Sequence, residues 1–260
     1  MHPIVILVVL ALLAPPPVRS ADQILEQRRS ELLDNPALVG RPVWLQANSL
    51  RFLSILEENT SGKDYGAVIL LHGAGAHADW QEVIAPLRHH LASTGWDTLS
   101  LQMPITQEQG RTIIADALSD EATPRIRAAV AYFSERKRDN LVLIGHDRGA
   151  RSALAYLSAQ PDKRVRAFVA IGLSAESSDA QDPVVAAIGK LNIPMLDLYG
   201  SRDLTAVLDS AEARLGVARR NRRDRYRHEK VMGANHNFSG LQQSLQQRVG
   251  AWVRQVTGKK

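Results

Sequence analysis

The sequence predicts an α/β fold in which helices flank a mostly parallel central sheet. Strand-like segments alternate five times with segments of helical periodicity, which is the pattern of repeated β-α-β units. Gly66–Leu71 is a continuous apolar run, as expected of a strand that is buried on both faces of a parallel sheet. A second apolar run, residues 141–144, enters a turn with glycines at positions 145 and 149 and continues into a helical pattern. Together these features indicate one α/β domain.

Residues 1–20 are predicted to be a signal peptide rather than part of the fold. Residues 4–14 form an unbroken apolar run that is short for a membrane span, and three prolines end it. The residues after the prolines suit a signal peptidase, so we expect cleavage before Ala21. The alternative is an uncleaved membrane anchor. Cleavage would leave residues 21–260 as a single domain in the periplasm or outside the cell.

The composition indicates a protein with a substantial core and no nucleic-acid partner. Hydrophobic residues make up 45% of the chain, and the formal net charge of +5 does not indicate a nucleic-acid-binding protein. The chain has no cysteine, which excludes disulfides, cysteine-based metal sites and lipid attachment to cysteine. The neighbouring histidines at positions 89 and 90 and the scattered carboxylates lack metal-ligand spacing. We therefore predict neither a metal nor another cofactor.

The first elements of the domain are predicted to be a surface helix and two edge strands. Residues 21–38 place apolar side chains among charges, which favours a helix on the domain surface. Residues 42–47 and 51–57 alternate apolar and polar side chains, as edge strands of an antiparallel start would. After the buried strand Gly66–Leu71, an amphipathic helix is predicted over residues 79–93, followed by a strand over residues 96–103.

The second half of the chain continues the alternation of helices and strands. A helix over residues 124–137 precedes the strand that leads to the glycine turn, and Arg148–Ala159 is the helix that follows it. Further strands are predicted at residues 165–173, 194–199 and 226–232. Further helices are predicted at residues 182–191, 205–218 and 241–256, the last of them amphipathic.

Three titratable residues stand in loops directly after predicted strands: Asp147, Asp203 and His236. Because the carboxyl ends of parallel strands border the ligand crevice, we expect these side chains to lie close together. The glycine turn Gly-x-Asp-x-Gly places Asp147 where a nucleophile elbow normally carries serine. The chain order is nucleophile, acid, histidine. A further loop, His72-Gly73-Ala74-Gly75, follows the first buried strand.

These four loops, in this order, resemble those of the α/β-hydrolases over residues 40–257. The elbow Gly-His-Asp-Arg-Gly is similar to that of Asp-nucleophile members such as epoxide hydrolases and haloalkane or haloacetate dehalogenases. The whole pattern is most similar to a family of uncharacterised, exported, α/β-hydrolase-like bacterial proteins without a cap. Only residues 174–194 lie between the strand after the elbow helix and the acid strand, so we expect no large cap domain.

The resemblance implies a small-molecule substrate and a role for each loop. Asp147 would attack a saturated carbon, Asp203 would orient the histidine, and His236 would activate water. His72, Gly73, Ala74 and Gly75, together with Arg148, would form the oxyanion and substrate-binding loops. An epoxide, a halo-acid or an ester is the implied substrate.

Alternatives remain open at each of these positions. Asp147 is also compatible with a non-catalytic envelope protein that keeps the fold for binding or interaction. His236 would then be a loop histidine satisfied by hydrogen bonds. Asp203 is also placed to cap a helix starting near Thr205, and Asp197 is a rival acid inside the same strand. His146 is expected to pack beneath the elbow.

One segment of the chain is strongly basic. It contains Arg219, Arg220, Arg222, Arg223 and Arg225. One interpretation is a solvated helix end, where the helix dipole favours positive charge. The other is contact with an anionic envelope surface, either a polymer or lipid headgroups.

Overall fold

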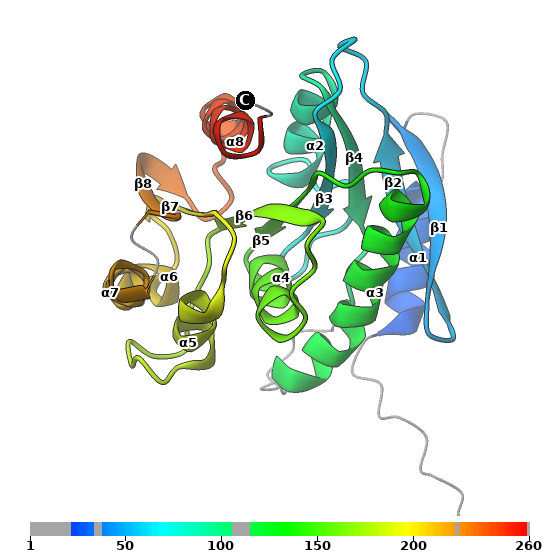
Figure 1. The fold of residues 1–260 in the computed structure, drawn as a ribbon. Coiled ribbons are helices and arrows are strands. Elements are labelled where there is room, and N and C mark those ends of the chain that lie inside the picture. The colour runs from blue at the N-terminus through cyan, green and yellow to red at the C-terminus, as the bar shows by residue number, and fades with distance from the viewer. Residues whose placement is uncertain (1–21, 34–37, 106–114, 222–223, 259–260) are drawn as a thin grey trace, which may run out of the picture.

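The computed structural model describes residues 22–33, 38–105, 115–221 and 224–258, with the backbone alone for residues 115–120 (Figure 1). The predicted signal peptide lies outside the described residues. Within them, eight strands form one sheet in the order β1-β2-β4-β3-β5-β6-β7-β8. The strands are β1 (Arg41–Ala47), β2 (Leu50–Glu57), β3 (Gly66–Leu71), β4 (Trp96–Leu101), β5 (Leu141–His146), β6 (Val165–Ile171), β7 (Met195–Arg202) and β8 (Tyr226–Asn235).

The sheet is antiparallel only at its start. β1 pairs with β2 and β2 with β4 in antiparallel register, and every later pairing from β3 to β8 is parallel. All residues of β3 and β5 are buried, as a central parallel strand covered on both faces requires. The edge strand β1 alternates partly buried and exposed residues instead. These findings confirm the predicted mostly parallel α/β fold.

Helices cover both faces of this sheet. They are α1 (Gln23–Leu33), α2 (Ile84–Ala92), α3 (Ala115–Glu135), α4 (Arg148–Ala159), α5 (Pro183–Lys190), α6 (Thr205–Asp209), α7 (Ala211–Asn221) and α8 (Gln242–Thr257). α2 and α8 lie over one face and α3, α4 and α5 over the other (Figure 1). Two apolar clusters result, one under each helical layer. The largest stabilising contribution comes from this burial of apolar side chains.

Several helix boundaries differ from the prediction. α2 begins at Ile84 rather than at residue 79, because Asp79 instead accepts a hydrogen bond from Arg88. α3 begins at Ala115 and runs through Pro124, which costs one main-chain hydrogen bond without ending the helix. The helix predicted over residues 205–218 is divided at Ser210, whose hydroxyl donates to the carbonyl of Ala206 over 2.6 Å. Such back-bonding by serine bends helices.

The helix α1 packs its polar side against the domain. Glu26 and Ser30 are buried, whereas Ile24 and Leu32 are 67% and 75% exposed. The reason is an ion pair between Glu26 and Arg125 of α3, with a nitrogen–oxygen distance of 2.6 Å. α1 is also shorter than the predicted helix of residues 21–38, and residues 34–37 lie outside the described residues.

The segment between β6 and β7 is short, and α5 is its one helix. The α/β fold therefore has no large cap over the carboxyl ends of its strands, as predicted. Among the described residues, no helix is both long and apolar enough to cross a membrane.

Candidate functional site

Asp147 stands at the sharp turn between β5 and α4. Its backbone has a φ of 50° and a ψ of −117°, a conformation that a residue with a side chain rarely adopts. The flanking glycines allow this turn, because a Cβ at Gly149 would lie 2.3 Å from the carbonyl oxygen of Leu71. A Cβ at Gly145 would lie 2.5 Å from the Cα of Ala150. The strain holds the Asp147 side chain at the carboxyl edge of the sheet.

Asp203 and His236 reach the same edge from the ends of β7 and β8. The Nδ1 atom of His236 lies 2.6 Å from Oδ1 of Asp203. Its Nε2 atom lies 3.9 Å from Oδ1 of Asp147. Asp203 also accepts hydrogen bonds from the backbone amides of Gly200, at 3.0 Å, and Leu204, at 2.8 Å. The structure thus brings together the three residues that the sequence singled out.

The charges of Asp147, Asp203 and His236 shift the pKa values of two of these residues, Asp203 and His236. Burial alone would lower the pKa of His236, but the hydrogen bond and charge of Asp203, together with the charge of Asp147, raise it. Burial likewise opposes ionisation of Asp203, yet the bonds from His236 and Gly200 hold the pKa of its carboxyl below the usual range. An ionised Asp203 keeps the proton of neutral His236 on Nδ1. The lone pair of Nε2 then faces Asp147.

The loop of residues 72–76, here called the oxyanion loop, supplies a main-chain donor to Asp147. The amide of Ala74 donates to Oδ2 of Asp147 over 2.9 Å. His72 is buried and touches no solvent-filled space around Asp147. Its Nδ1–H donates to the carbonyl of Gly73 at 2.8 Å, while Nε2 accepts from the amide of Met103 at 2.9 Å. Burial lowers the pKa of His72 to about 3, so the ring stays neutral.

The remaining residues predicted for this loop region lie around the same site. Gly75 is exposed at the tip of the oxyanion loop, with a φ of 69°. Arg148 is the first residue of α4, so its amide stands at the N-terminus of that helix. With His72 and Gly73, Arg148 lines a cavity of about 10 Å³, too small for a substrate.

A larger cavity of about 220 Å³ opens directly over Asp147 and His236. Its remaining walls come from the oxyanion loop, from the segment that follows it, and from residues next to Asp147, Asp203 and His236 in the chain. They are Ala74, Ala76, Trp80, His146, Leu204 and Asn237. Half of the eight lining residues are apolar, and the other half are polar or titratable. The position of Asn237 directly after His236 was the only sequence signal for its presence here.

The rival assignments for the acid do not fit the structure. Asp203 caps no helix, because the residue at the N-terminal boundary of α6 is Leu204. Asp197 is completely buried and is bound to Arg214 over 2.8 Å and to the hydroxyl of Tyr226 over 2.5 Å. Burial opposes its ionisation, but Arg214 and His228 lower the pKa of Asp197 to about 2. The carboxylate of Asp197 is therefore part of a buried ion pair in the core and does not belong to the group around Asp147.

His146 lies beneath the elbow, as predicted. It is buried, and its ring centroid lies 4.8 Å from that of His236. Its Nε2–H donates to the carbonyl of His236 over 3.0 Å. Burial lowers the pKa of His146, and the nearby His236 lowers it further. His146 therefore supports the histidine loop from below.

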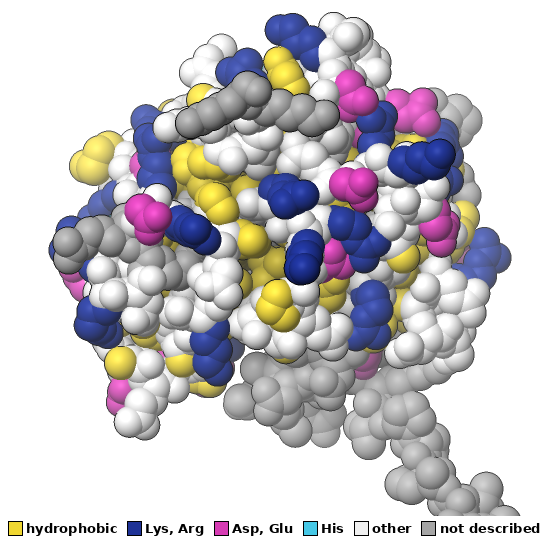
Figure 2. All heavy atoms as spheres, in the orientation of Figure 1, with side chains coloured by type: hydrophobic (Ala, Val, Ile, Leu, Met, Phe, Trp, Pro, Cys, Tyr) yellow, Lys and Arg dark blue, Asp and Glu magenta, His cyan; other side chains and the backbone are white. Residues whose placement is uncertain are grey.

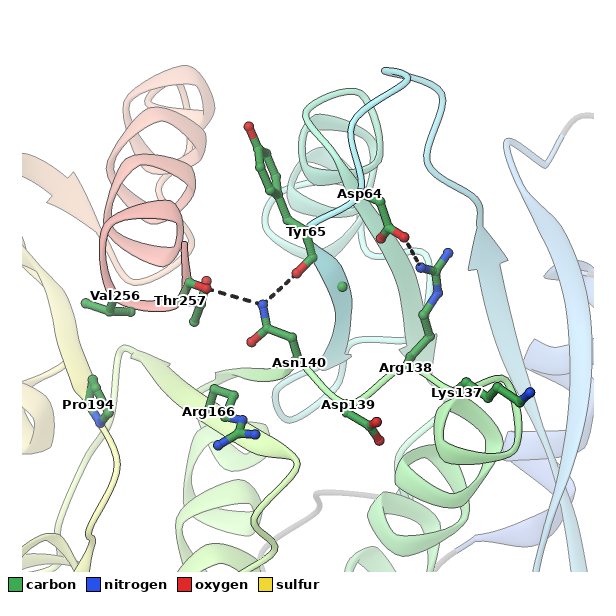
Figure 3. A pocket seen from close by; sticks show the side chains of 11 residues that line it. Asp64, Tyr65, Lys137, Arg138, Asp139, Asn140, Arg166, Pro194, Val256 and Thr257 are labelled. Atoms are coloured by element: carbon green, nitrogen blue, oxygen red, sulfur yellow. Dashed lines mark hydrogen bonds and ion pairs between the residues drawn. The ribbon is translucent and has the colours of Figure 1, made fainter. Parts of the chain in front are cut away.

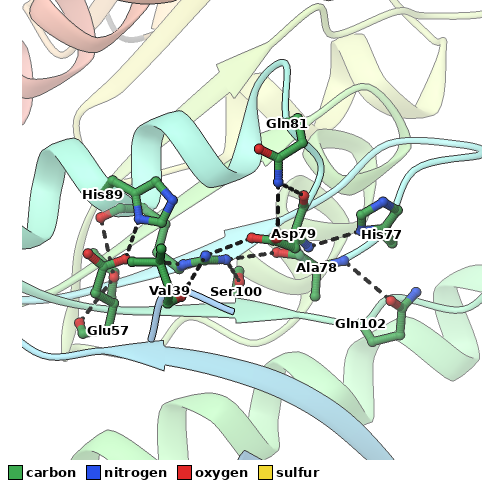
Figure 4. A network of polar contacts seen from close by, with 11 residues as sticks. Val39, Glu57, His77, Ala78, Asp79, Gln81, His89, Ser100 and Gln102 are labelled. Atoms are coloured by element: carbon green, nitrogen blue, oxygen red, sulfur yellow. Dashed lines mark hydrogen bonds and ion pairs between the residues drawn. The ribbon is translucent and has the colours of Figure 1, made fainter. Parts of the chain in front are cut away.

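The segment that follows the oxyanion loop is fixed by a buried polar network (Figure 4). Arg88 of α2 is fully buried and donates to Oδ1 of Asp79 over 2.6 Å and to Oε2 of Glu57 over 3.3 Å. Beside it, the amide of Ala78 donates to the side chain of Gln102 over 3.3 Å (Figure 4). The network holds the backbone that leads to Trp80.

A hollow of about 550 Å³ lies at the opposite edge of the sheet (Figure 3). Its lining includes Gly66, where β3 begins, and Thr257, where α8 ends. Lys and Arg side chains surround apolar ones on this face (Figure 2). Arg138 is already bound to Asp64 over 2.5 Å. Positive charge is expected here, because α3 and α8 end at this edge and helix C-termini favour cations. The helix ends therefore account for the positive charge around this hollow.

Two further predictions concern metals and the basic segment. Among the described residues, no three His, Asp or Glu side chains gather closely enough to hold a metal ion. Of the basic segment, Arg219 and Arg220 are exposed in the last turn of α7. Arg225 donates to the carbonyl of Asn192 over 2.7 Å. The two arginines at positions 222 and 223 lie outside the described residues.

A family model matches the chain over residues 11–124 and 113–255, which is most of its length. The chain belongs to the DUF3530 family. The family is described as a protein of unknown function. No curated protein matches the chain significantly. Membership of DUF3530 therefore supports the predicted kinship with uncharacterised proteins and assigns no activity.

Solved structures show that this DUF3530 protein has the α/β-hydrolase fold. A dienelactone hydrolase from Anabaena variabilis matches with a TM-score of 0.66 and 18% identity, over 83% of this chain and 97% of its own. Est1E from Butyrivibrio proteoclasticus matches with a TM-score of 0.65 and 14% identity, over 84% and 99%. XC6422 from Xanthomonas campestris, described as a serine hydrolase without a lid, matches with a TM-score of 0.63 and 14% identity, over 87% and 98%. These similarities establish the fold alone.

Proposed function

We propose that this DUF3530 protein is a hydrolase in which Asp147 displaces a leaving group from a saturated carbon of a small molecule. The orientation of the Asp147 carboxylate carries the proposal. Its Oδ2 atom accepts the 2.9 Å hydrogen bond from Ala74, and its Oδ1 atom faces the Nε2 atom of His236 at 3.9 Å. One oxygen is held by a main-chain donor, while the other remains available for attack.

In the first step, Oδ1 of Asp147 forms a bond to the substrate carbon. The bond from that carbon to the leaving group breaks, and the leaving group takes its electron pair. The product of this step is an ester between Asp147 and the substrate. With a halo-acid the leaving group is the halide. With an epoxide it is the ring oxygen, which stays attached to the other ring carbon and takes its proton from water. The apolar part of the 220 Å³ cavity, formed by Ala74, Ala76, Trp80 and Leu204, would accommodate the carbon skeleton of a small substrate.

In the second step, water attacks the carbonyl carbon of Asp147. Nε2 of His236 takes a proton from the water, and Asp203 stabilises the resulting imidazolium through the 2.6 Å bond to Nδ1. The negative charge that develops on Oδ2 meets the amide of Ala74, which is already in place. When this intermediate collapses, the alcohol leaves with the Oδ1 oxygen and takes the proton back from Nε2 of His236, while the oxygen from water stays in Asp147.

The same geometry favours epoxides and halo-acids over esters. Attack of a carboxylate on an ester carbonyl would give an anhydride, which is less stable than the ester it replaces. The carbonyl oxygen of such a substrate would also need an oxyanion donor, and the Ala74 amide is occupied by Oδ2 of Asp147. Substitution at saturated carbon needs that donor only in the second step.

Mass spectrometry of the His236→Gln variant tests the proposal. Without water activation, incubation with a panel of epoxides, halo-acids and esters should leave an adduct of substrate mass on Asp147. A matched control is His90→Gln, since His90 lies on α2 away from the cavity. The adduct should be absent from the double variant with Asp147→Asn. No adduct and no turnover by the unaltered protein with the panel would favour a non-catalytic role in binding.

We also propose export through the signal peptide of residues 1–20, to the periplasm or the outside of the cell. The exposure of Arg219 and Arg220 supports contact with an anionic surface of the envelope. N-terminal sequencing of the exported protein tests whether the signal peptide is cleaved before Ala21. A mature chain that begins at Met1 would contradict cleavage.

A further inference from the structure

We propose that Arg29 of α1 is a positioning residue for the oxyanion loop. The side chain of Arg29 holds the backbone of the loop so that the amide of Ala74 faces Asp147. The inference rests on the proposed function, because it gives Ala74 the role of oxyanion donor. It adds a functional element, α1, that lies before the first strand of the α/β-hydrolase sheet.

The contact between Arg29 and the loop is direct. Nη1 of Arg29 donates to the carbonyl oxygen of Gly75 over 2.8 Å and to that of Ala76 over 2.9 Å. These two carbonyls follow Ala74 immediately in the chain. With both carbonyls turned toward α1, the preceding amide is left to point toward the elbow. A cationic donor makes such hydrogen bonds stronger than neutral ones.

Within the oxyanion loop, the amide of Ala76 donates to the carbonyl of Gly73 over 3.3 Å, a long hydrogen bond that leaves the turn in need of further support. Gly75 is exposed and has a φ of 69°, and no atom lies within 4 Å of the position that its Cβ would occupy. Glycine also has more conformations to lose than any other residue. At the start of the loop, His72 binds the carbonyl of Gly73. Arg29 provides the corresponding support at the other end.

α1 is itself fixed by a buried ion pair. Oε1 and Oε2 of Glu26 lie 2.6 Å and 3.1 Å from the guanidinium of Arg125, which is 1% exposed. Burial raises the pKa of Glu26, although Arg125 opposes this effect. Arg125 also donates to the carbonyl of Gln102 over 2.6 Å. Because removing one partner of such a pair is costly, α1 has one favoured position.

Gln102 connects this ion pair to the same loop region. Its side chain binds the amide of Ala78 (Figure 4). The amide nitrogen of Gln102 also lies 2.9 Å from Nε2 of His72. The group formed by Glu26, Arg125 and Gln102 therefore contacts the His72 side chain at the start of the oxyanion loop and the backbone of Ala78 just after it. Arg29 contacts the carbonyls of Gly75 and Ala76 from the exposed side of the loop. The burial of the polar face of α1 follows from the same contacts.

The experiment compares Arg29→Met with Arg28→Met in the protein of residues 21–260. Arg28 is exposed on the same helix, so both variants lose one charge and gain the same side chain. Amide hydrogen exchange of the oxyanion loop is measured by NMR without any substrate. Exchange at Ala74 should become about tenfold faster in Arg29→Met, as expected from the loss of a charged hydrogen bond. It should be unchanged in Arg28→Met.

A second readout concerns catalysis. With a substrate that labels Asp147 in the His236→Gln background, turnover by Arg29→Met should fall at least about tenfold in kcat, with KM little changed. Arg29→Lys, which keeps a cation, should recover part of both effects. A general loss of protection, including the amides of β5, would indicate unfolding of Arg29→Met, and Arg29→Gln would then replace it.

Equal exchange at Ala74 in the Arg29 and Arg28 variants would overturn the inference. So would a kcat of Arg29→Met equal to that of Arg28→Met when a substrate is known. Failure of the proposed function looks different. No member of the panel would label Asp147 in any background, while the exchange of Ala74 would still depend on Arg29.

Discussion

Alanine in place of Gly172 should displace the ring of His236. Gly172 follows β6 with a φ of 60°, and its Cβ would lie 2.8 Å from Cε1 and 2.9 Å from Nδ1 of His236. Contacts this short do not occur between such atoms, so the ring must move. Its 2.6 Å hydrogen bond to Asp203 would then lengthen or break.

The expected loss of stability has two parts. A left-handed conformation costs an alanine about 1–2 kcal/mol. Loss of a hydrogen bond between charged partners adds about 1.5–3 kcal/mol. Gly62→Ala is the matched control, because Gly62 has a φ of 74° and no atom lies within 4 Å of its Cβ position. Gly62→Ala should therefore lose only about 1–2 kcal/mol, the cost of the left-handed conformation.

Two measurements on the folded protein check this prediction. Urea unfolding gives the difference in free energy between the variants. NMR titration of labelled histidine gives the pKa of His236, which should fall in Gly172→Ala because Asp203 contributes to raising it. Hydrolysis of an Asp147 adduct should slow by about a hundredfold. The reasoning is refuted if His236 titrates as in the unaltered protein and Gly172→Ala costs no more than Gly62→Ala.

The remaining predictions concern pH and the basic segment. Burial lowers the pKa of His72 to about 3. The contribution of neutral His72 to stability is therefore complete above the unfolded pKa of about 6.5. It is lost as the pH falls from there toward 3, by up to about 1.4 kcal/mol per pH unit. Urea unfolding between pH 7 and pH 4.5 should therefore bring His72→Gln closer to the unaltered protein, whereas a constant difference would contradict the assignment. Replacing Arg222, Arg223 and Arg225 by Gln should weaken sedimentation with anionic vesicles by about 1 kcal/mol for each residue, and no binding of the unaltered protein to such vesicles would remove the proposed contact.

The sequence alone determined the fold and the three central residues of the site. β3 and β5 were evident because strands buried on both faces need continuous apolar runs. Asp147, Asp203 and His236 were evident because each follows a strand, and parallel strands end at one edge. The glycines of the elbow marked the turn, since only they permit the close approach of Leu71 and Ala150.

Only the tertiary structure decided how the Asp147 carboxylate is oriented and what holds the loop beside it. The bond from Ala74 to Asp147 joins residues 73 positions apart, and that from Arg29 to Gly75 joins residues 46 positions apart. Local periodicity carries no information about such pairs. The same holds for the polar face that α1 buries, because its partner Arg125 lies 99 positions away from Glu26. Long-range hydrogen bonds of this kind depend on how the packed elements place individual side chains, and the hydrophobic pattern does not specify that.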